Sequence, residues 1–216
     1  MISEEKYKQY FNNLLQGKKG VCLQVLGDLL EEDKQIKEIY EDLFRRSLYG
    51  VGELWELNKI SVATEHMATA ITENMMITLQ PRIFGTERSG KKAVIACVAN
   101  EYHQVGAKMI ADMFEMHGWD GYFIGANTPA KELLRFIEET QPDVTGLSLS
   151  IYFNMNVLHE TLQHIRKEFP LMPVLVGGQA FRWGGKEVIA AYENVHLLET
   201  LDALESFILR HNRNQD

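Results

Sequence analysis

The sequence predicts an α/β protein in two parts, a four-helix bundle followed by a parallel, doubly wound sheet of five strands. Residues 1 to about 80 carry apolar side chains at helical spacing and show no strand signals. From Lys92 onward, short apolar runs alternate with helical patterns, and this alternation produces a parallel sheet with helices on both faces. We therefore expect a helical domain over residues 1–84 and a sheet domain over residues 91–216.

The first part is expected to hold four helices joined by short connections. Residues 14–30 form two helical patterns with a break between them. A longer helix is expected over residues 34–57, and another from about Ser61 to Leu79, ending before Pro81. Four such helices suggest an up-down bundle. The residues that follow, 81–91, are rich in glycine and charge and are expected to form a linker.

The second part alternates strands with helices. The strands are expected at residues 93–99, 120–124, 143–149, 172–176 and 195–198. One helix is expected to begin at Thr128-Pro129, with the proline at the first helical position, and Thr200 is expected to cap the last helix. These elements indicate a flavodoxin-like (Rossmann-like) fold.

Composition and charge exclude several classes of function. The chain has 216 residues and a net charge of -8, and it contains no cluster of Lys and Arg, so we expect no direct nucleic-acid binding. Cys22 and Cys97 are the only cysteines and suggest neither a disulfide framework nor a zinc site. The chain opens with polar residues and has no apolar run of membrane-spanning length. A cytoplasmic location without membrane association is expected.

The residues Glu101 to Gly106 are the first candidate site. They follow an apolar strand and precede a helical pattern, at the rim where ligands bind in open α/β sheets. Residues two apart in an extended loop point the same way, so Glu101 can hold one ring nitrogen of His103 while the other faces the cleft. A carboxylate placed in this way orients a metal-bound histidine. The alternative is an ordinary loop histidine bonded to a nearby acid.

Two later strand ends add further candidates at the same rim. The third strand ends with Ser148 and Ser150, and the fourth is followed by Gly177, Gly178 and Gln179. Paired glycines remove side chains where a ligand could enter between sheet and helix, although tight packing at a turn explains them equally well. A phosphate cradle has less support, because the P-loop pattern is absent.

Taken together, these elements resemble a known signature. Glu101-x-His103-x-x-Gly106, then Ser148, then Gly177-Gly178 is similar to the cobalamin-binding pattern Asp-x-His-x-x-Gly, Ser-x-Leu, Gly-Gly. The resemblance covers the whole chain, because a helical bundle precedes the sheet in that family too. It implies that His103 displaces the cofactor's dimethylbenzimidazole and ligates cobalt from below, with Glu101 and Ser148 tuning the ligand. The residues that it places at the cofactor are Glu101, Tyr102, His103, Gln104, Val105, Gly106, Ser148, Ser150, Gly177, Gly178 and Gln179.

The sequence departs from that pattern at two positions. Glu101 stands where the family more often has Asp, which keeps the carboxylate. Ser150 stands where the middle element has Leu, which changes the contacts to the nucleotide tail.

The bundle carries a second signature. Trp55, nine intervening residues and then Glu65-His66 resemble the light-sensing adenosylcobalamin-binding domains. The resemblance implies that Trp55 packs on the adenosyl group, that Glu65 hydrogen-bonds it, and that His66 lies near the upper face of cobalt. Val62, one turn before His66, shares that face. The alternative is a core tryptophan and a surface Glu-His pair. A methyl group, as in methylcobalamin, would need neither an aromatic wall nor a polar contact.

One residue separates this chain from the light sensors that bind DNA. Those proteins carry a histidine directly after the tryptophan, and here that position is Glu56. The remaining candidate for the cobalt after photolysis is His66.

The leading hypothesis is a cobalamin-dependent light sensor or signalling module that is not an enzyme. The chain starts directly with the bundle, so it is expected to act through a separate partner such as a transcription regulator, or by changing its own oligomeric state. The runner-up is a corrinoid protein that carries a methyl group between partner enzymes. Against it stand the Trp55 signature and the residues Val105, Ala107 and Lys108, where that family usually has Ile, Lys and Asn. A subunit of an adenosylcobalamin-dependent mutase has less support.

Overall fold

The computed structural model describes residues 1–213. The chain divides into two compact units, residues 1–82 and the residues from Ile83 onward. Within residues 1–213, no helix combines the length and the apolar character that crossing a bilayer requires.

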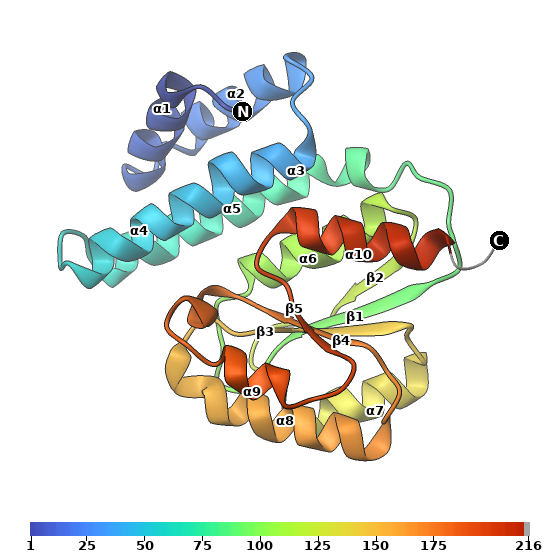
Figure 1. Cartoon of the computed structure of the whole chain (residues 1–216). Helices are drawn as coiled ribbons and strands as arrows, with labels where there is room; N and C mark the ends of the chain where they lie inside the picture. The colour runs from blue at the N-terminus through green and yellow to red at the C-terminus, as the bar shows by residue number, and fades with distance from the viewer. Residues whose placement is uncertain (214–216) are drawn as a thin grey trace. The chain divides into compact units, whose positions relative to one another are not determined.

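The first unit is entirely helical. Its elements are α1 (Glu4–Leu15), α2 (Lys19–Glu31), α3 (Ile36–Glu38), the π-helix η1 (Ile39–Arg45), α4 (Arg46–Glu56) and α5 (Val62–Ile83). Because α3, η1 and α4 follow one another without a break, the long helix expected over residues 34–57 is present, with a π segment inside it. The structure thus confirms four helical segments, of which α4 and α5 run side by side (Figure 1).

Side chains define where these helices begin and how they pack. The hydroxyl of Ser3 accepts a hydrogen bond from the backbone N–H of Lys6, and that of Ser61 accepts one from Thr64, at the starts of α1 and α5. Between the helices lies an aromatic core of Tyr10, Tyr40 and Phe44, all fully buried. The Phe44 ring lies 5.9 Å from each of the two tyrosine rings. Burial of such rings supplies much of the packing energy of a small helical unit.

Two helix boundaries differ from the sequence prediction. Helix α5 does not end at Leu79 but continues through Pro81 to Ile83. A proline removes only its own hydrogen bond to the carbonyl four residues earlier, and the other turns of this 22-residue helix remain intact. Pro129 has an extended conformation with ψ of 139° and lies at the N-cap of α7, one residue before the helix.

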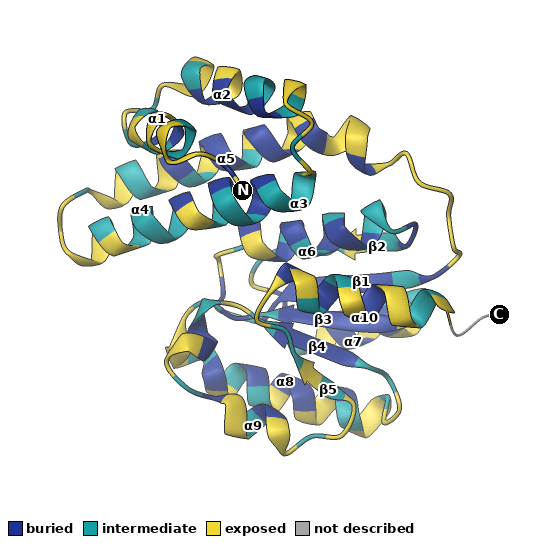
Figure 2. Cartoon of the chain, turned by 45° about the horizontal axis from the view of Figure 1, so that its top comes forward, coloured by how far each residue is buried: buried dark blue, intermediate teal, exposed yellow. Residues whose placement is uncertain are grey.

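The second unit is a five-stranded parallel sheet. Its strands are β1 (Lys92–Cys97), β2 (Asp120–Phe123), β3 (Val144–Ser148), β4 (Val174–Gly177) and β5 (Val195–Leu197). They are arranged in the order β2-β1-β3-β4-β5, which is the flavodoxin-like order that the sequence predicts. The central strands are almost wholly buried, whereas the edge strands β2 and β5 are not (Figure 2).

Helices cover both faces of this sheet. They are α6 (Val105–Met116), α7 (Ala130–Thr140), η2 (Tyr152–Asn154), α8 (Met155–Glu168), η3 (Gln179–Arg182), α9 (Lys186–Ala190) and α10 (Leu201–Arg213). Figure 1 shows α6 and α10 on one face and α7, α8 and α9 on the other. The backbone N–H of Ala203 donates to the Thr200 hydroxyl at 3.1 Å, which confirms the cap expected for α10.

The register of the sheet aligns the carboxyl ends of three strands. Cys97 of β1 pairs with Ser148 of β3, and Ser148 pairs with Gly177 of β4. The loops that follow these strands therefore leave the sheet side by side, at the edge where the candidate residues were expected.

Gly178 allows the loop after β4 to lie close to the loop after β3. Its φ is +119°, and a Cβ at this position would lie 2.2 Å from the carbonyl oxygen of Leu149. Only glycine has this conformation without strain and also fits against that carbonyl.

We expect Gly178→Ala to lower the free energy of unfolding of the sheet unit by about 2–4 kcal/mol, because it adds both backbone strain and a steric conflict. Urea unfolding followed by circular dichroism measures the loss. The matched control is Gly106→Ala, because a Cβ there meets nothing within 4 Å. That variant should leave stability unchanged or raise it by up to about 1 kcal/mol. Equal stability of the two variants would disprove the conflict at Gly178.

Candidate functional site

His103 and Glu101 form a hydrogen-bonded pair in the loop between β1 and α6. The ring Nδ1 of His103 lies 2.6 Å from Oε1 of Glu101, and the backbone N–H of His103 donates to the same oxygen at 3.0 Å. The histidine side chain is 55% exposed, whereas the glutamate is fully buried. The contact expected from the two-residue spacing is therefore present, with the imidazole at the surface and the acid behind it.

The second oxygen of Glu101 is bound by the loop after β3. The backbone N–H groups of Ser150 and Ile151 donate to Oε2 at 2.7 and 2.8 Å. Burial raises the pKa of this carboxyl, but the hydrogen bonds from His103, Ile151 and Ser150 outweigh it and lower the pKa below its usual value. An ionised carboxylate only accepts hydrogen bonds, so Nδ1 of the imidazole carries a proton, and in the neutral ring the lone pair then lies on Nε2.

Three asparagines hold the same loop in place. Asn100 has a left-handed backbone with φ of 65°, which asparagine tolerates better than most residues. Its N–H donates to Oδ1 of Asn127 at 2.8 Å, and its carbonyl accepts from the side chain of Asn154 at 3.0 Å. The N–H of Asn127 also donates to the carbonyl of Glu101. We did not predict these positioning residues from the sequence. The available signal was an asparagine, Asn100, directly after the strand predicted at residues 93–99.

Ser148 is the last residue of β3, and the loop after it binds the Glu101 carboxylate through the backbone N–H groups of Ser150 and Ile151. The role expected for Ser148 beside the ligand stays a prediction. Burial and the nearby Glu101 charge raise the pKa of the Cys97 thiol to about 12, while a hydrogen bond with Ser148 acts in the opposite direction. The thiol next to the histidine loop thus stays protonated at neutral pH, and a protonated thiol is a poor metal ligand.

The structure explains the presence of glycine differently at the three candidate positions. A Cβ at Gly177 would lie 2.9 Å from the carbonyl oxygen of Leu198, and Gly178 packs on Leu149. Backbone packing therefore explains this pair without a ligand. Gly106 has open space where a Cβ would be, and the fold gives no reason for a glycine there. A ligand that approaches the start of α6 would give one.

The other candidates of the sheet unit surround the pair. Tyr102 is 68% exposed, Val105 is buried, Gln104 is the N-cap residue of α6, and Gln179 begins η3 in a half-buried position. Among residues 1–213, no three His, Cys, Asp or Glu side chains converge as a site for a metal ion.

The candidates of the helical unit lie where α4 ends and α5 begins. Trp55 and Val62 are 47% and 50% exposed, so neither belongs to the core of that unit. Oε1 of Glu65 accepts the Thr69 hydroxyl at 3.1 Å, and its Oε2 lies 3.4 Å from Nε2 of His66. The side chain of His66 is 73% exposed. The interpretation of Trp55 as a core residue is therefore wrong.

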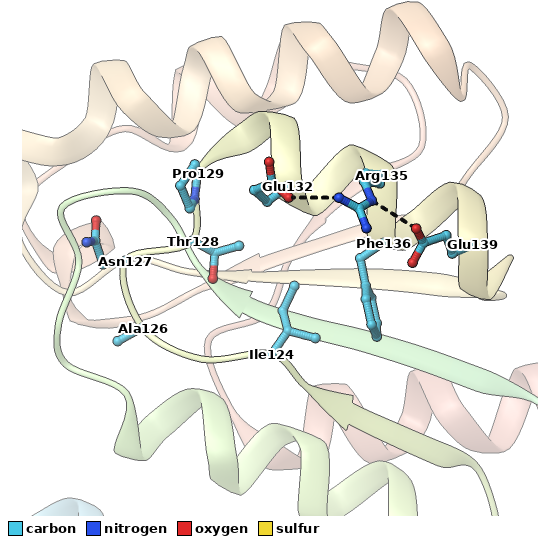
Figure 3. A pocket seen from close by; sticks show the side chains of 9 residues that line it. All are labelled: Ile124, Ala126, Asn127, Thr128, Pro129, Glu132, Arg135, Phe136 and Glu139. Carbon is cyan, nitrogen blue, oxygen red and sulfur yellow. Dashed lines mark hydrogen bonds and ion pairs between the residues drawn. The ribbon is translucent and has the colours of Figure 1, made fainter.

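A separate hollow of about 410 Å³ lies beside α7 (Figure 3). None of the predicted site residues lines it. Figure 3 shows Arg135 between Glu132 and Glu139, and its guanidinium lies 3.8 and 2.9 Å from their carboxylate oxygens. The positive charge in this hollow is thus paired within the helix itself.

Comparison with known proteins places the chain among relatives of two kinds. The HTH-type transcriptional repressor CarH of Myxococcus xanthus is 30% identical over 145 residues, which are 66% of this chain and 48% of the repressor. Dimethylamine corrinoid protein 3 of Methanosarcina acetivorans is 23% identical over 145 residues, which are 66% of this chain and 68% of that protein. The chain thus spans about half the length of the repressor.

A solved structure shares the fold, and family models match both units. The monomethylamine corrinoid protein of Methanosarcina barkeri superposes with a TM-score of 0.82 at 12% identity, covering 97% of this chain and 100% of that one. Residues 91–206 match a family model described as a B12 binding domain, and residues 7–80 match a second model with the same description. The chain is therefore a cobalamin-binding protein and belongs to the B12-binding domain family.

Proposed function

We propose that the chain is an adenosylcobalamin-binding light sensor or signalling module and not an enzyme. The observation that carries this proposal is the exposure of Trp55, a large aromatic side chain that the helical unit leaves half exposed at the end of α4, while Val62, Glu65 and His66 follow at the start of α5. An aromatic surface with a neighbouring carboxylate suits a large, polar adenosyl group. The 30% identity to a transcriptional repressor supports a regulatory role.

We assign the lower face of cobalamin to the sheet domain that the sequence predicts over residues 91–216. His103 would supply Nε2 to cobalt, since Glu101 holds the other ring nitrogen at 2.6 Å. Gly106 leaves open space at the start of α6. The loops that carry Ser148, Ser150 and Gly177-Gly178-Gln179 would surround the nucleotide tail. Tyr102, Gln104 and Val105 flank the histidine in the chain.

We assign the upper face to the helical domain that the sequence predicts over residues 1–84. Trp55 would pack on the adenosyl group and Glu65 would accept a hydrogen bond from it. Glu65 is steadied by Thr69, at 3.1 Å, so its carboxylate is partly positioned in advance. Bound adenosylcobalamin supplies a weak cobalt–carbon bond that green light breaks. His66, 73% exposed, is the side chain that we place nearest the upper ligand position, because Glu56 follows Trp55.

We propose that a partner protein, or a change in assembly, transmits the signal. With a net charge of -8, the chain is a poor partner for nucleic acid. A separate transcription regulator, or a change in the assembly of the chain itself, would read the state of the helical unit. Loss of the adenosyl group would remove the surface on which we place Trp55, and a ligand that distinguishes two states shifts the balance between them.

The second candidate function is a corrinoid methyl carrier that serves a methyltransferase. The 23% identity to a dimethylamine corrinoid protein favours it. A methyl group, however, would leave Trp55 without a partner.

Absorption spectra test the two functions directly. The protein is reconstituted with adenosylcobalamin in the dark, and its visible spectrum and elution volume are recorded before and after green light. A light-dependent change in both supports the sensor, because loss of the adenosyl group changes the cobalt spectrum and the helical unit. Binding of methylcobalamin with equal affinity and no change in elution supports the methyl carrier.

In His103→Ala the spectrum should lose its histidine-ligated form, and an unchanged spectrum would rule out His103 as the ligand.

We expect Trp55→Ala to reduce the preference for adenosylcobalamin over methylcobalamin about tenfold, the order of magnitude of one lost aromatic contact. Titration of each cofactor in the dark gives the two dissociation constants. Leu57→Ala is the matched control, since Leu57 is 63% exposed at the same helix end and has no assigned role. If the ratio of constants is the same in both variants, Trp55 does not contact the adenosyl group.

Gly106→Ala should weaken cobalamin binding at least about tenfold, because the added methyl group occupies space that the protein itself leaves open. Binding titrations measure this effect, and unfolding of the cofactor-free protein shows that stability is retained. Undiminished affinity would mean that no ligand approaches the start of α6.

A further inference from the structure

The chain passes from the helical unit to the sheet unit inside helix α5. This helix continues to Ile83, but the first unit ends at Arg82, so the last residue of the helix already belongs to the sheet unit. Ile83 is fully buried, whereas Phe84 after it is 49% exposed. The end of α5 is thus anchored in the second unit, while its earlier turns belong to the first.

The residues that follow α5 are bound to the turn between α6 and β2. The hydroxyl of Thr86 donates to the carbonyl of Met116 at 2.9 Å. The backbone N–H of Ser89 donates to the carbonyl of Gly118 at 2.8 Å, and the Ser89 hydroxyl donates to the same oxygen at 3.0 Å. The sequence predicts a linker over residues 81–91, but residues 86–89 are held at both ends.

Two further contacts fix the middle of that segment. The Arg88 guanidinium donates to the carbonyl of Trp119 at 2.8 Å and pairs with the Glu115 carboxylate. Gly118 has a φ of +82°, and a Cβ there would lie 2.3 Å from the carbonyl oxygen of Glu87. Residues 84 and 85 therefore lie between two anchored points of one unit, and bending there does not move one unit against the other.

The turn of α5 just before the boundary is weak for two reasons. Pro81 has no N–H to donate to the carbonyl of Ile77, and its ring crowds that carbonyl. The hydroxyl of Thr78 donates to the carbonyl of Met75 at 2.7 Å, and bonds of this kind weaken and bend a helix. Sharp bends in helices occur mostly at such places.

We propose that the hinge between the two units is the turn of α5 around Pro81, and that the predicted linker is not a hinge. The proposal rests on the proposed function where that function requires the helical unit to move after the adenosyl group is lost. A helix with one weak turn gives such a movement a defined axis, as hinges between domains do, whereas a free linker gives none.

Pulsed electron paramagnetic resonance of the cofactor-free protein is the first experiment. Spin labels at Lys8→Cys and Glu160→Cys, two exposed positions in α1 and α8, report the distance between the units. Cys22 and Cys97 are buried and stay unlabelled. Pro81→Ala gives the turn its missing N–H, so the distribution of distances should become narrower by about a third or more.

Gln80→Ala is the matched control, because Gln80 is exposed on the same turn and its replacement changes no backbone hydrogen bond. Its distance distribution should match that of the unaltered protein. Equal widths in Pro81→Ala and in the unaltered protein would overturn the hinge. A single narrow distance in the unaltered protein would overturn it too.

Hydrogen exchange tests whether residues 86–89 are held. The amide of Ser89 should be protected, because it donates to the carbonyl of Gly118. Pro81→Ala should leave this protection unchanged, since the contact lies within the sheet unit. An unprotected Ser89 amide in the unaltered protein would mean that this segment is a free linker, and the proposal would be wrong.

Green light connects the hinge to the proposed function. With adenosylcobalamin bound, illumination should shift the label distance in the unaltered protein. Pro81→Ala should reduce that shift at least about twofold, while its absorption spectrum changes as before. An equal shift in the two proteins would contradict the hinge. No shift in the unaltered protein would refute the light response, whereas the distance widths without cofactor would still report the hinge.

Discussion

A buried negative charge is the constraint on which the rim of the sheet depends. A carboxylate removed from water is costly unless hydrogen bonds replace its hydration. Glu101 obtains these bonds from a histidine two residues away and from two backbone amides of the neighbouring loop. Because β1 and β3 are neighbours in the sheet, the chain can supply both sets of donors at once. The strand order therefore brings both sets of donors to one carboxylate.

The relatives of this chain have different names: a repressor and a dimethylamine corrinoid protein are similar in sequence, and a monomethylamine corrinoid protein shares the fold. A fold shared in this way does not determine what a protein does, and the function must be argued from particular side chains. In this chain the proposal is based on His103 with its buried acid and on Trp55 with Glu65. We propose that the first pair binds cobalamin and that the second selects its upper ligand.

Much of the fold follows from local patterns in the sequence. The central strands are continuous apolar runs because both faces are buried, and their ends agree with the prediction to within about two residues. The contact between Glu101 and His103 follows from their spacing. The amides of Ser150 and Ile151 could not be foreseen, since any residue provides a backbone donor. The π-helix within residues 39–45 and the passage of α5 through Pro81 likewise depend on packing that local patterns do not record.

The start of α6 has a further consequence for motion. Its N-cap residue, Gln104, makes no capping hydrogen bond with its side chain, the first turn contains no acidic residue, and Gly106 is the second residue of the helix. Each of these features weakens the first turn of a helix, glycine by its larger loss of backbone entropy. Fraying of α6 should therefore begin beside His103, while the buried methionines Met109 and Met113 hold the later turns on the sheet. Such an opening would expose the backbone beside His103 without unfolding the sheet unit.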